Sequence, residues 1–378
     1  MQLINTTSNN LSGHFVVNTN VFLLLIYKMG NHRHSLRVFF SLSLYFFTLF
    51  HSNAQSLGSI EGKIVDAKTK ESLPGASVYL ANTSIGTAAG NDGSFLLDKI
   101  TNGKYNLTVS MLGYKTFSKP IVFNDNSVKN FIIYLNEEAI ELNLVEVKAK
   151  RDFNNYDFSK FQKFFLGSTQ NANRCKIVNF HDLQITNNAS LLTASAKKPI
   201  EILNYALGYR IIYVLKEFVL NKTKNTLWMS GVPRFENLVP ENEKQQRRWT
   251  RERDRAYYGS VEHFIRSLKS RELKKNRFTL TNWDGLEINE QKLLLPNQDS
   301  VISYRGKIRV IFSGELAEPS YKRGFQESTI DFTGRNVTIY SNGKYDPFED
   351  VLLFEYFGWS SCVAELMPLG YQPASRLK

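Results

Sequence analysis

The chain has few of the residues from which most catalytic centres are built. Its 378 residues include two cysteines and six histidines. Of the histidines, only His181 and His263 lie beyond residue 54. No H-x-x-E motif occurs, because His181 is followed by Asp182, Leu183 and Gln184. This excludes a zinc peptidase site of that kind. A G-x-S-x-G elbow and a phosphate-binding loop are also missing. We therefore expect no catalytic residue, metal site or cofactor.

Long apolar runs are also scarce, and the longest has the features of a secretory signal. Met29 precedes Arg33 and Arg37, an apolar run at residues 38–50, and the small residues at 52–54. This order predicts a cleaved signal peptide at 29–54 and an extended gene start at 1–28. The alternative is a membrane anchor, but a bilayer needs about 20 apolar residues. No cysteine follows the run, so we expect no lipid anchor.

The two cysteines, Cys175 and Cys362, both lie in the second half of the chain. Export would place them in an oxidising compartment, where an even number of cysteines indicates a disulfide. The sequence therefore predicts one bridge between them, with two buried free thiols as the alternative.

Residues 58–135 read as short strands joined by turns that contain glycine. At Tyr105, Leu107, Val109 and Met111 every second residue is apolar, as in a half-buried strand. Similar alternation is found at residues 60–64, 76–80, 94–97 and 131–135, with turn residues between these segments. This spacing is typical of a β-sandwich.

Six short motifs in this segment follow one another in a family-specific order. They are G-x-[VI]-x-D from Gly62, P-G-A-x-V from Pro74, G-T at Gly86, D-G-x-F from Asp92, G-x-Y-x-L from Gly103 and G-Y at Gly113. In this order the segment resembles the carboxypeptidase regulatory-like domain. The resemblance implies an all-β sandwich of the transthyretin (prealbumin) type over residues 56–135. In that family the module has no catalytic residues, and it accompanies metallocarboxypeptidases or stands at the N-terminus of TonB-dependent outer-membrane receptors. Residues 142–150 resemble the linker that follows it there, which suggests a linker at 136–151.

Positive charge is concentrated beyond the sandwich. Residues 56–150 hold 10 lysines, no arginine and 10 acidic residues, whereas residues 243–277 hold 12 basic and 5 acidic residues. Within this second segment, apolar residues at helical spacing predict an amphipathic helix over at least 260–273, with Ser260 as its N-cap.

A basic helix near 243–277 indicates an anionic partner, because clustered Lys and Arg create a local positive potential. The contacts we expect are Arg247, Arg248, Arg251, Arg255, Arg266 and Lys269. The alternative is a solvated helix that its acidic residues partly neutralise. No nucleic-acid motif accompanies the charge, so nucleic acid is not the expected partner.

The rest of residues 152–378 predicts an α+β region. Asp157 can cap a helix that ends at Gly167, and a second helix is expected from Pro199 to Gly208, followed by a strand at 209–219. Further strands are predicted at 307–313, 329–332 and 336–340, with an apolar stretch at 351–366.

The sequence therefore predicts a non-enzymatic, exported binding protein of the cell envelope, periplasmic or associated with the outer membrane and at most peripheral to it. Its expected partner is an envelope protein, a glycan or an anionic lipid. The alternative is a hydrolase of peptide or glycan with its site in the C-terminal region, because paired carboxylates leave no sequence signature. A purely structural role is a third possibility.

Overall fold

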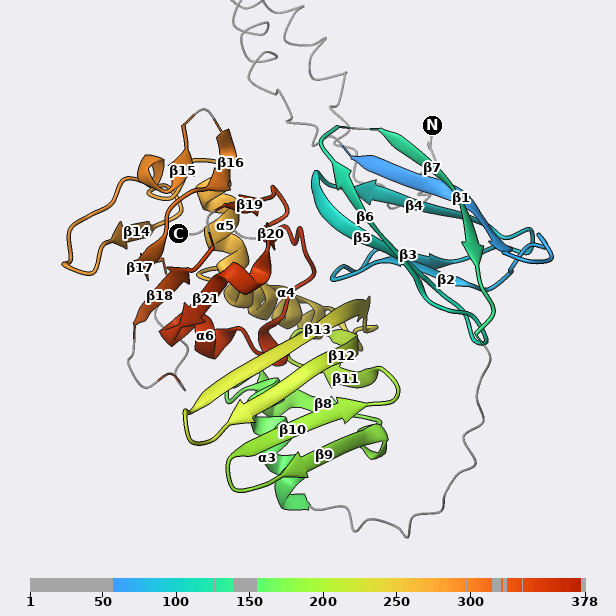
Figure 1. Ribbon diagram of the computed structural model, residues 1–378, viewed down its shortest axis with the longest axis horizontal. Coiled ribbons are helices and arrows are strands. Elements are labelled where there is room, and N and C mark those ends of the chain that lie inside the picture. The colour runs from blue at the N-terminus through green and yellow to red at the C-terminus, as the bar shows by residue number, and fades with distance from the viewer. Residues whose placement is uncertain are drawn as a thin grey trace, which may run out of the picture. The chain divides into compact units, whose positions relative to one another are not determined.

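The computed structural model describes residues 57–125, 127–138, 155–296, 298–314, 321, 325–334 and 336–374 (Figure 1). The expected gene start, the signal peptide and residues 139–151 of the expected linker lie outside the described residues. From Ser56 onward the chain forms one compact unit.

The N-terminal part of this unit is a sandwich of two sheets. One sheet has the strand order β4-β1-β7 and the other has the order β3-β2-β5-β6. The strands are β1 (Gly58–Asp66), β2 (Ser77–Leu80), β3 (Gly86–Ala88), β4 (Ser94–Ile100), β5 (Gly103–Ser110), β6 (Phe117–Phe123) and β7 (Val128–Leu135). The predicted β-sandwich is therefore confirmed, and the sequence reading missed only β3 and β6.

The first and last motifs of the sandwich meet in space. Asp66, at the end of β1, accepts hydrogen bonds from Lys68 N at 2.7 Å, Thr69 N at 2.8 Å and the Tyr114 hydroxyl at 2.9 Å. The bonds from Thr69 and Lys68 hold the pKa of Asp66 below its usual value. Asp66 thereby ties the turn after β1 to the corner that follows β5.

A six-stranded antiparallel sheet forms the next part of the chain. Its order is β8-β11-β12-β10-β9, and β13 pairs along the other edge of the long strand β12. The strands are β8 (Cys175–Ile177), β9 (Leu183–Asn187), β10 (Leu191–Ala196), β11 (Ile200–Asn204), β12 (Tyr209–Asn221) and β13 (Thr226–Asn237). Helix α3 (Asn155–Leu166) packs on this sheet, where Phe161 stacks on Phe165 at 4.9 Å and meets Phe218 edge-on at 4.9 Å.

Two local predictions in this part are wrong. The segment after Pro199 is strand β11, which pairs with β12. Every second residue of it, namely Ile200, Ile202 and Asn204, is buried in the core. Asp157 lies inside the first turn of α3, two residues after the helix begins at Asn155, and not at the capping position; its carboxylate accepts a bond from Asn187 Nδ2 at 2.5 Å. The predicted strand at 209–219 is confirmed.

The last part of the chain combines two four-stranded sheets with three helices. One sheet is β14 (Phe278–Thr281), β17 (Gly306–Phe312), β18 (Gln326–Phe332) and β21 (Val351–Phe354), and the other is β15 (Leu294–Leu295), β16 (Gln298–Ile302), β19 (Val337–Ile339) and β20 (Tyr345–Asp346). The helices are α4 (Glu243–Tyr257), α5 (Val261–Lys269) and α6 (Glu355–Ser360). Short 3-10 helices lie here at Glu290–Lys292, Phe348–Asp350 and Val363–Glu365, and two more lie near the six-stranded sheet at Ala172–Arg174 and Phe180–Asp182. The α+β character of this region is confirmed.

The sandwich is joined to the C-terminal region by backbone hydrogen bonds from one turn. Asn82 N donates to Pro233 O at 2.7 Å, and Phe235 N donates to Thr83 O at 3.0 Å. Asn82 O also accepts from Leu369 N at 2.7 Å. The turn after β2 therefore binds both the outer edge of β13 and the end of the chain.

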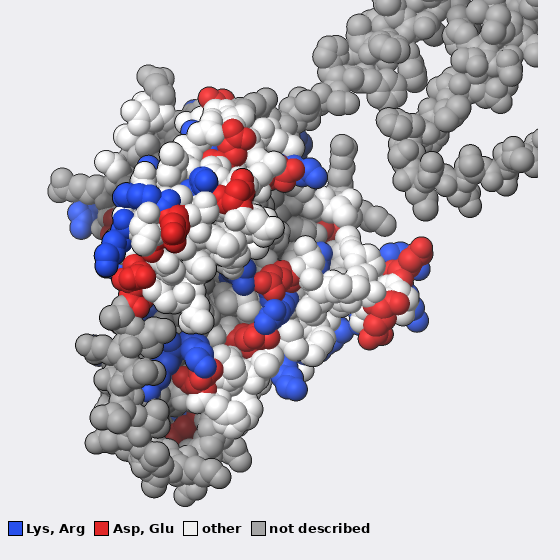
Figure 2. Space-filling model, turned by 90° about the vertical axis from the view of Figure 1, so that its right-hand side faces the viewer, with Lys and Arg blue, Asp and Glu red and all other residues white. Residues whose placement is uncertain are grey.

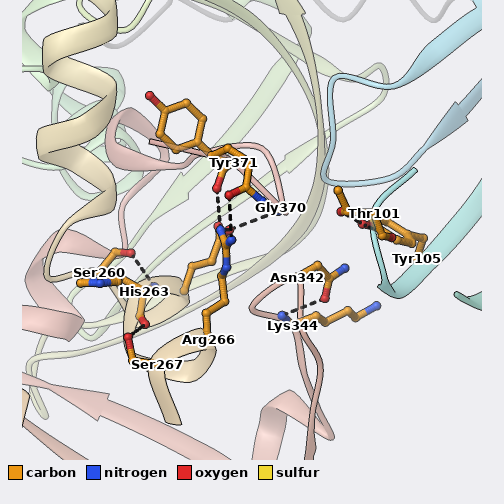
Figure 3. Close-up of polar contacts among 12 residues, drawn as sticks. Thr101, Tyr105, Ser260, His263, Arg266, Ser267, Asn342, Lys344, Gly370 and Tyr371 are labelled. Atoms are coloured by element: carbon orange, nitrogen blue, oxygen red, sulfur yellow. Dashed lines mark hydrogen bonds and ion pairs between the residues drawn. The ribbon is translucent and has the colours of Figure 1, made fainter. Parts of the chain in front are cut away.

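Residues 369–374, here called the C-terminal strap, connect several elements (Figure 3). Gly370 N donates to Glu262 Oε1 of α5 at 3.1 Å, and the Tyr371 hydroxyl donates to Asp254 Oδ1 of α4 at 2.7 Å. Arg266 of α5 donates through Nη1 to Tyr371 O at 2.5 Å. Because the same strap bonds to the sandwich turn, it fixes both helices and the sandwich in one assembly.

The largely buried carboxyl group of Glu262, whose side chain is 13% exposed, should make stability depend on pH. Burial raises its pKa from about 4.5 to about 8, although Arg266 and Gly370 N–H oppose the shift. The folded state then keeps a proton that the unfolded chain loses, so this group's contribution to stability declines as pH rises from 4.5 to 8. Glu262→Gln keeps an oxygen for Gly370 N–H but cannot ionise. Urea denaturation at pH 5 and pH 8 should therefore show the wild type losing stability relative to this variant. A difference that stays constant with pH would contradict this assignment.

Candidate functional site

The predicted basic helix is two helices separated by a turn. Helix α4 begins after Asn242, whose Oδ1 accepts a bond from Gln245 N at 3.0 Å. Helix α5 begins after Ser260, whose hydroxyl accepts from His263 N at 3.1 Å, so the predicted N-cap is confirmed. The predicted extension to Leu273 is wrong, since α5 ends at Lys269 and Arg271 has a φ of 55°.

One face of α4 is fixed to the turn between β11 and β12. Trp249 is 2% exposed, and its indole N–H donates to Tyr205 O at 3.0 Å. Arg253 donates to Leu207 O at 2.6 Å and to Gly208 O at 3.0 Å. Gly208 has a φ of +70°, and a Cβ there would lie 2.3 Å from the Trp249 ring. These contacts fix the rotation of α4, and therefore which of its residues face solvent.

Five cationic residues occupy the opposite face of α4. They recur at positions i, i+3, i+4, i+7 and i+11, which lie on one side of a helix. All five are exposed, and they extend over about 16 Å at 1.5 Å per residue. We call this set the α4 stripe: Lys244, Arg247, Arg248, Arg251 and Arg255.

Two glutamates offset only part of this charge. Arg247 pairs with Glu243 at 3.0 Å, and Glu252 accepts from Arg251 at 3.2 Å and from Arg255 at 3.0 Å. Five cations against two carboxylates leave a net charge of +3. The three paired arginine side chains are 57–72% exposed, so these ion pairs are weak and can exchange for a ligand. Among the residues that the structure describes, neither Lys244 nor Arg248 forms an ion pair.

On the face that Figure 2 shows, basic and acidic side chains are interspersed. On α4 the acidic residues flank the row of cations, so the cations remain adjacent to one another. Because like charges so close together repel, the arrangement favours a bound counter-charge.

Four of the six predicted contact residues lie in the stripe, and the other two lie elsewhere. Arg266 and Lys269 belong to α5, where Arg266 bonds to the C-terminal strap and Lys269 Nζ bonds to Ser300 Oγ. The guanidinium group of Arg266 and the amino group of Lys269 therefore make contacts within the protein. The sequence reading left Lys244 out of the contact set, although its helical spacing from Arg247 and Arg248 could have included it.

The two cysteines are free thiols, so the predicted disulfide is not formed. Cys175 Sγ donates to Asn171 O at 3.4 Å, and Cys362 is buried in the core under α3. Burial raises the pKa of Cys175 to about 12 and that of Cys362 still further above its usual value. Each thiol packs as a small apolar group and is unreactive as a nucleophile.

The two histidines that the structure describes differ in their surroundings. His263 is buried among aromatic rings, and its Nδ1 accepts a hydrogen bond from Gly259 N at 3.1 Å. Burial lowers the pKa of His263 to about 3, so the ring is neutral at physiological pH. His181 lies against Phe180, with ring centroids 3.8 Å apart. Within the described part of the chain, no three His, Cys, Asp or Glu side chains are grouped to hold a metal ion.

A cavity of about 660 Å³ lies between β14 and the turn after α5. Its lining combines apolar residues such as Phe278, Leu280 and Ile288 with three glutamates: Glu272, Glu287 and Glu290. Glu272 pairs with Lys275 at 2.5 Å, and Glu287 pairs with Lys274 at 3.1 Å. Two of the three carboxylates are therefore paired with lysines.

No helix in the described ranges has both the length and the apolar character needed to span a bilayer.

Comparison with known proteins identifies the sandwich. Residues 60–147 match the family model of the CarboxypepD_reg-like domain, so the predicted carboxypeptidase regulatory-like domain is confirmed for just under a quarter of the chain. The remaining C-terminal region matches no family. No curated protein matches the chain.

Several solved structures resemble parts of the fold. The group B streptococcus pilus 2b backbone protein is 20% identical with a TM-score of 0.19, over 22% of this chain and 42% of that protein. A DUF3823 family protein from Parabacteroides merdae is 13% identical with a TM-score of 0.17, over 48% of this chain and 79% of that one. A putative membrane-associated protein of unknown function from Bacteroides fragilis is 11% identical with a TM-score of 0.18, over 47% and 95%. At TM-scores this low, none of these similarities indicates a function.

Proposed function

We propose that this protein is an exported, non-enzymatic binding protein of the cell envelope, and that its α4 stripe contacts an anionic partner. The observation that carries this proposal is the stripe itself: five adjacent, exposed cations on a helix whose other face is fixed by Trp249 and Arg253. A fixed helix presents its charges without the entropic cost of ordering the backbone on binding.

The composition of the exposed face defines the mode of contact. Apart from the stripe, the exposed residues of α4 are Glu243 and Gln246, so no apolar side chain accompanies the cations. An interfacial membrane helix needs an apolar face to enter the bilayer. The stripe therefore suits contact with anionic groups at a surface, on an envelope protein, a glycan or a lipid headgroup, without insertion.

The sandwich supports the same proposal in a different way. Its family is a non-catalytic module, and here its turn at residues 82–83 is hydrogen-bonded to β13 and the C-terminal strap. It acts as a support for the C-terminal region that carries the stripe. The signal-like pattern at residues 29–54 supports export.

Charge reversal of the stripe should abolish partner binding. In a pull-down from envelope extract, the variant with Arg247, Arg248, Arg251 and Arg255 replaced by glutamate should retain at least tenfold less partner than the wild type. Wild-type binding should also weaken when salt is raised from about 0.05 M to about 0.5 M, because screening shortens the range of exposed charges.

The matched control reverses four exposed lysines outside α4 and changes net charge by the same amount. These are Lys68, Lys115, Lys197 and Lys224. This control should bind as the wild type does. Equal losses in both variants would indicate a general charge effect, and full binding by the stripe variant would remove α4 from the interaction.

A hydrolase of peptide or glycan is the second candidate, and the cavity beside β14 is where its site would lie. A carboxylate that acts as acid or base must reach the substrate. At this cavity Glu272 and Glu287 are each paired with a lysine, so neither carboxylate is free to act on a substrate. We therefore prefer the binding function to the hydrolase.

A further inference from the structure

The sheet β14-β17-β18-β21 has one face toward the core and one face toward solvent. Every second residue of β17 is buried in the core cluster that includes α5, namely Ile308, Val310 and Phe312. Lys307 and Arg309 therefore lie on the opposite face. Residues paired directly across antiparallel strands share a face. One row of such residues crosses all four strands on the solvent face: Thr281, Arg309, Thr329 and Phe354.

Two exposed aromatic residues lie at the ends of this row. Phe354, at the end on β21, is 42% exposed. Trp283 follows the other end, two residues after Thr281, and is 60% exposed. The turn that carries Trp283 is closed by Asn282, whose N–H donates to Leu286 O at 2.8 Å and whose Oδ1 accepts from Leu286 N at 2.8 Å. These bonds fix the backbone position of Trp283 beside the sheet.

Lys307 lies between the two rings. Its Nζ is 5.9 Å from the centroid of the Trp283 ring and 5.9 Å from that of the Phe354 ring, so both rings belong to one patch of the surface. These distances are at the limit of a cation–π contact, so a ligand can displace the ammonium group. Arg309 is closer, with Cζ 4.9 Å from the centroid of Trp283. Arg309 therefore covers one side of the indole, and the high exposure of Trp283 leaves the other side open.

The polar groups around the rings include both hydrogen-bond donors and acceptors. Asp331 lies directly opposite Lys307 in register, and Glu327 pairs with Arg309 at 3.6 Å. These two cations and two carboxylates, with Glu355 directly after β21, leave no excess of positive charge on this face. Among the residues that the structure describes, Lys307 forms no ion pair, and the Arg309 pair is long and partly exposed. Donors and acceptors are therefore both available to a ligand beside the rings.

We propose that Trp283, Phe354 and Lys307 form a binding site for a neutral glycan on this face. Aromatic ring faces are electron-rich, so the C–H face of a sugar ring stacks on them. The sugar hydroxyl groups both donate and accept hydrogen bonds, which suits the mixture of cations and carboxylates beside the rings. A nucleic acid or an anionic lipid would need an excess of positive charge, which this face lacks. The site is separate from the α4 stripe and does not depend on the function proposed for it.

The test is a calorimetric titration of the full chain with four neutral oligosaccharides: maltohexaose, cellohexaose, laminarihexaose and mannohexaose. We expect saturable binding of at least one of them, with the same affinity at about 0.05 M and about 0.5 M salt, because screening does not act on an uncharged ligand. Oligogalacturonate of the same length is the charged comparison. The proposal would be overturned if none of the neutral probes bound saturably, or if the oligogalacturonate bound more tightly than all of them and lost its binding at high salt.

Three variants separate binding from folding. Trp283→Ala should weaken glycan binding at least tenfold and leave the stability of the chain unchanged, because the side chain is largely exposed. Trp283→Tyr keeps a ring for stacking and should retain most of the affinity. Trp228→Ala is the matched control, because Trp228 is also exposed, at 42%, but lies on β13 of the six-stranded sheet. Equal losses in the two alanine variants, or full binding by Trp283→Ala, would contradict the site.

The same variant keeps this proposal distinct from that of the α4 stripe. Trp283→Ala leaves all five cations of α4 in place, so it should retain the anionic partner as the wild type does in the pull-down. Charge reversal of the stripe should in turn leave the affinity for the neutral glycan unchanged. Loss of glycan binding in the stripe variant would show that the sugar binds at α4 and would overturn the site at Trp283.

Discussion

Replacing Trp249 by alanine is expected to lower the free energy of unfolding by about 3–5 kcal/mol, the range for deleting a large buried aromatic side chain. The indole is 2% exposed, lies over Gly208 and donates a hydrogen bond to Tyr205 O at 3.0 Å. Alanine would leave a cavity between α4 and the six-stranded sheet, and Tyr205 O would keep only its hydrogen bond from Arg174 Nη2 at 3.1 Å. Urea denaturation followed by far-ultraviolet circular dichroism would measure the loss without relying on tryptophan fluorescence.

Trp249→Phe is the matched control for this prediction. It keeps an aromatic ring over Gly208 and removes the hydrogen bond to Tyr205, whose net contribution is about 1 kcal/mol. The alanine variant should also weaken partner binding, because α4 would no longer be fixed with its stripe toward solvent. An alanine variant within about 1 kcal/mol of the wild type would show that Arg253 alone fixes the helix.

The sandwich could be predicted from the sequence because its determinants are local. Alternation of apolar residues along β5 and the glycine turns around it are visible within a few residues, and the six motifs follow the order of the strands. The short strand β3 was missed because all of its residues are exposed, so it has no alternation to detect.

The error at Pro199 has a physical cause. Pro199 and the glycine at 208 are placed as they would be at the ends of a short helix, and the local sequence favours that reading. The partner that decides the outcome is β12, which pairs with β11 from Asn204 back to Ile200. A long-range pairing of this kind outweighs local propensity.

The candidate site shows the same division between local and distant information. The number of basic residues at 243–277 and their helical spacing are properties of the sequence, and they led to four of the five stripe residues. That Arg266 faces inward depends on Tyr371, more than 100 residues away along the chain.

Replacing Gly62 by alanine is expected to destabilise the sandwich by about 3 kcal/mol or more, above the usual range for overpacking, because the clash is with backbone. Strand β1 runs parallel to β7, with Gly62 opposite Phe131. A Cβ at Gly62 would lie 1.9 Å from Phe131 O, which cannot move without separating the two strands. The first glycine of the family motif is thereby explained by the close approach of two backbones.

Gly90→Ala is the control for this substitution, because its Cβ would meet the flexible side chains of Asp92 at 3.3 Å and Ser94 at 3.5 Å, and would lie at an ordinary van der Waals distance of 3.6 Å from Ser94 O. Limited proteolysis and urea denaturation should show a marked loss of stability for the Gly62 variant and little change for the Gly90 variant. The Gly62 variant should also lose the contacts of the 82–83 turn, since that turn is held by the sandwich core. If both variants were equally stable, β7 would have to shift along or away from β1 at little cost, and the pairing of β1 with β7 would not be what closes this sheet.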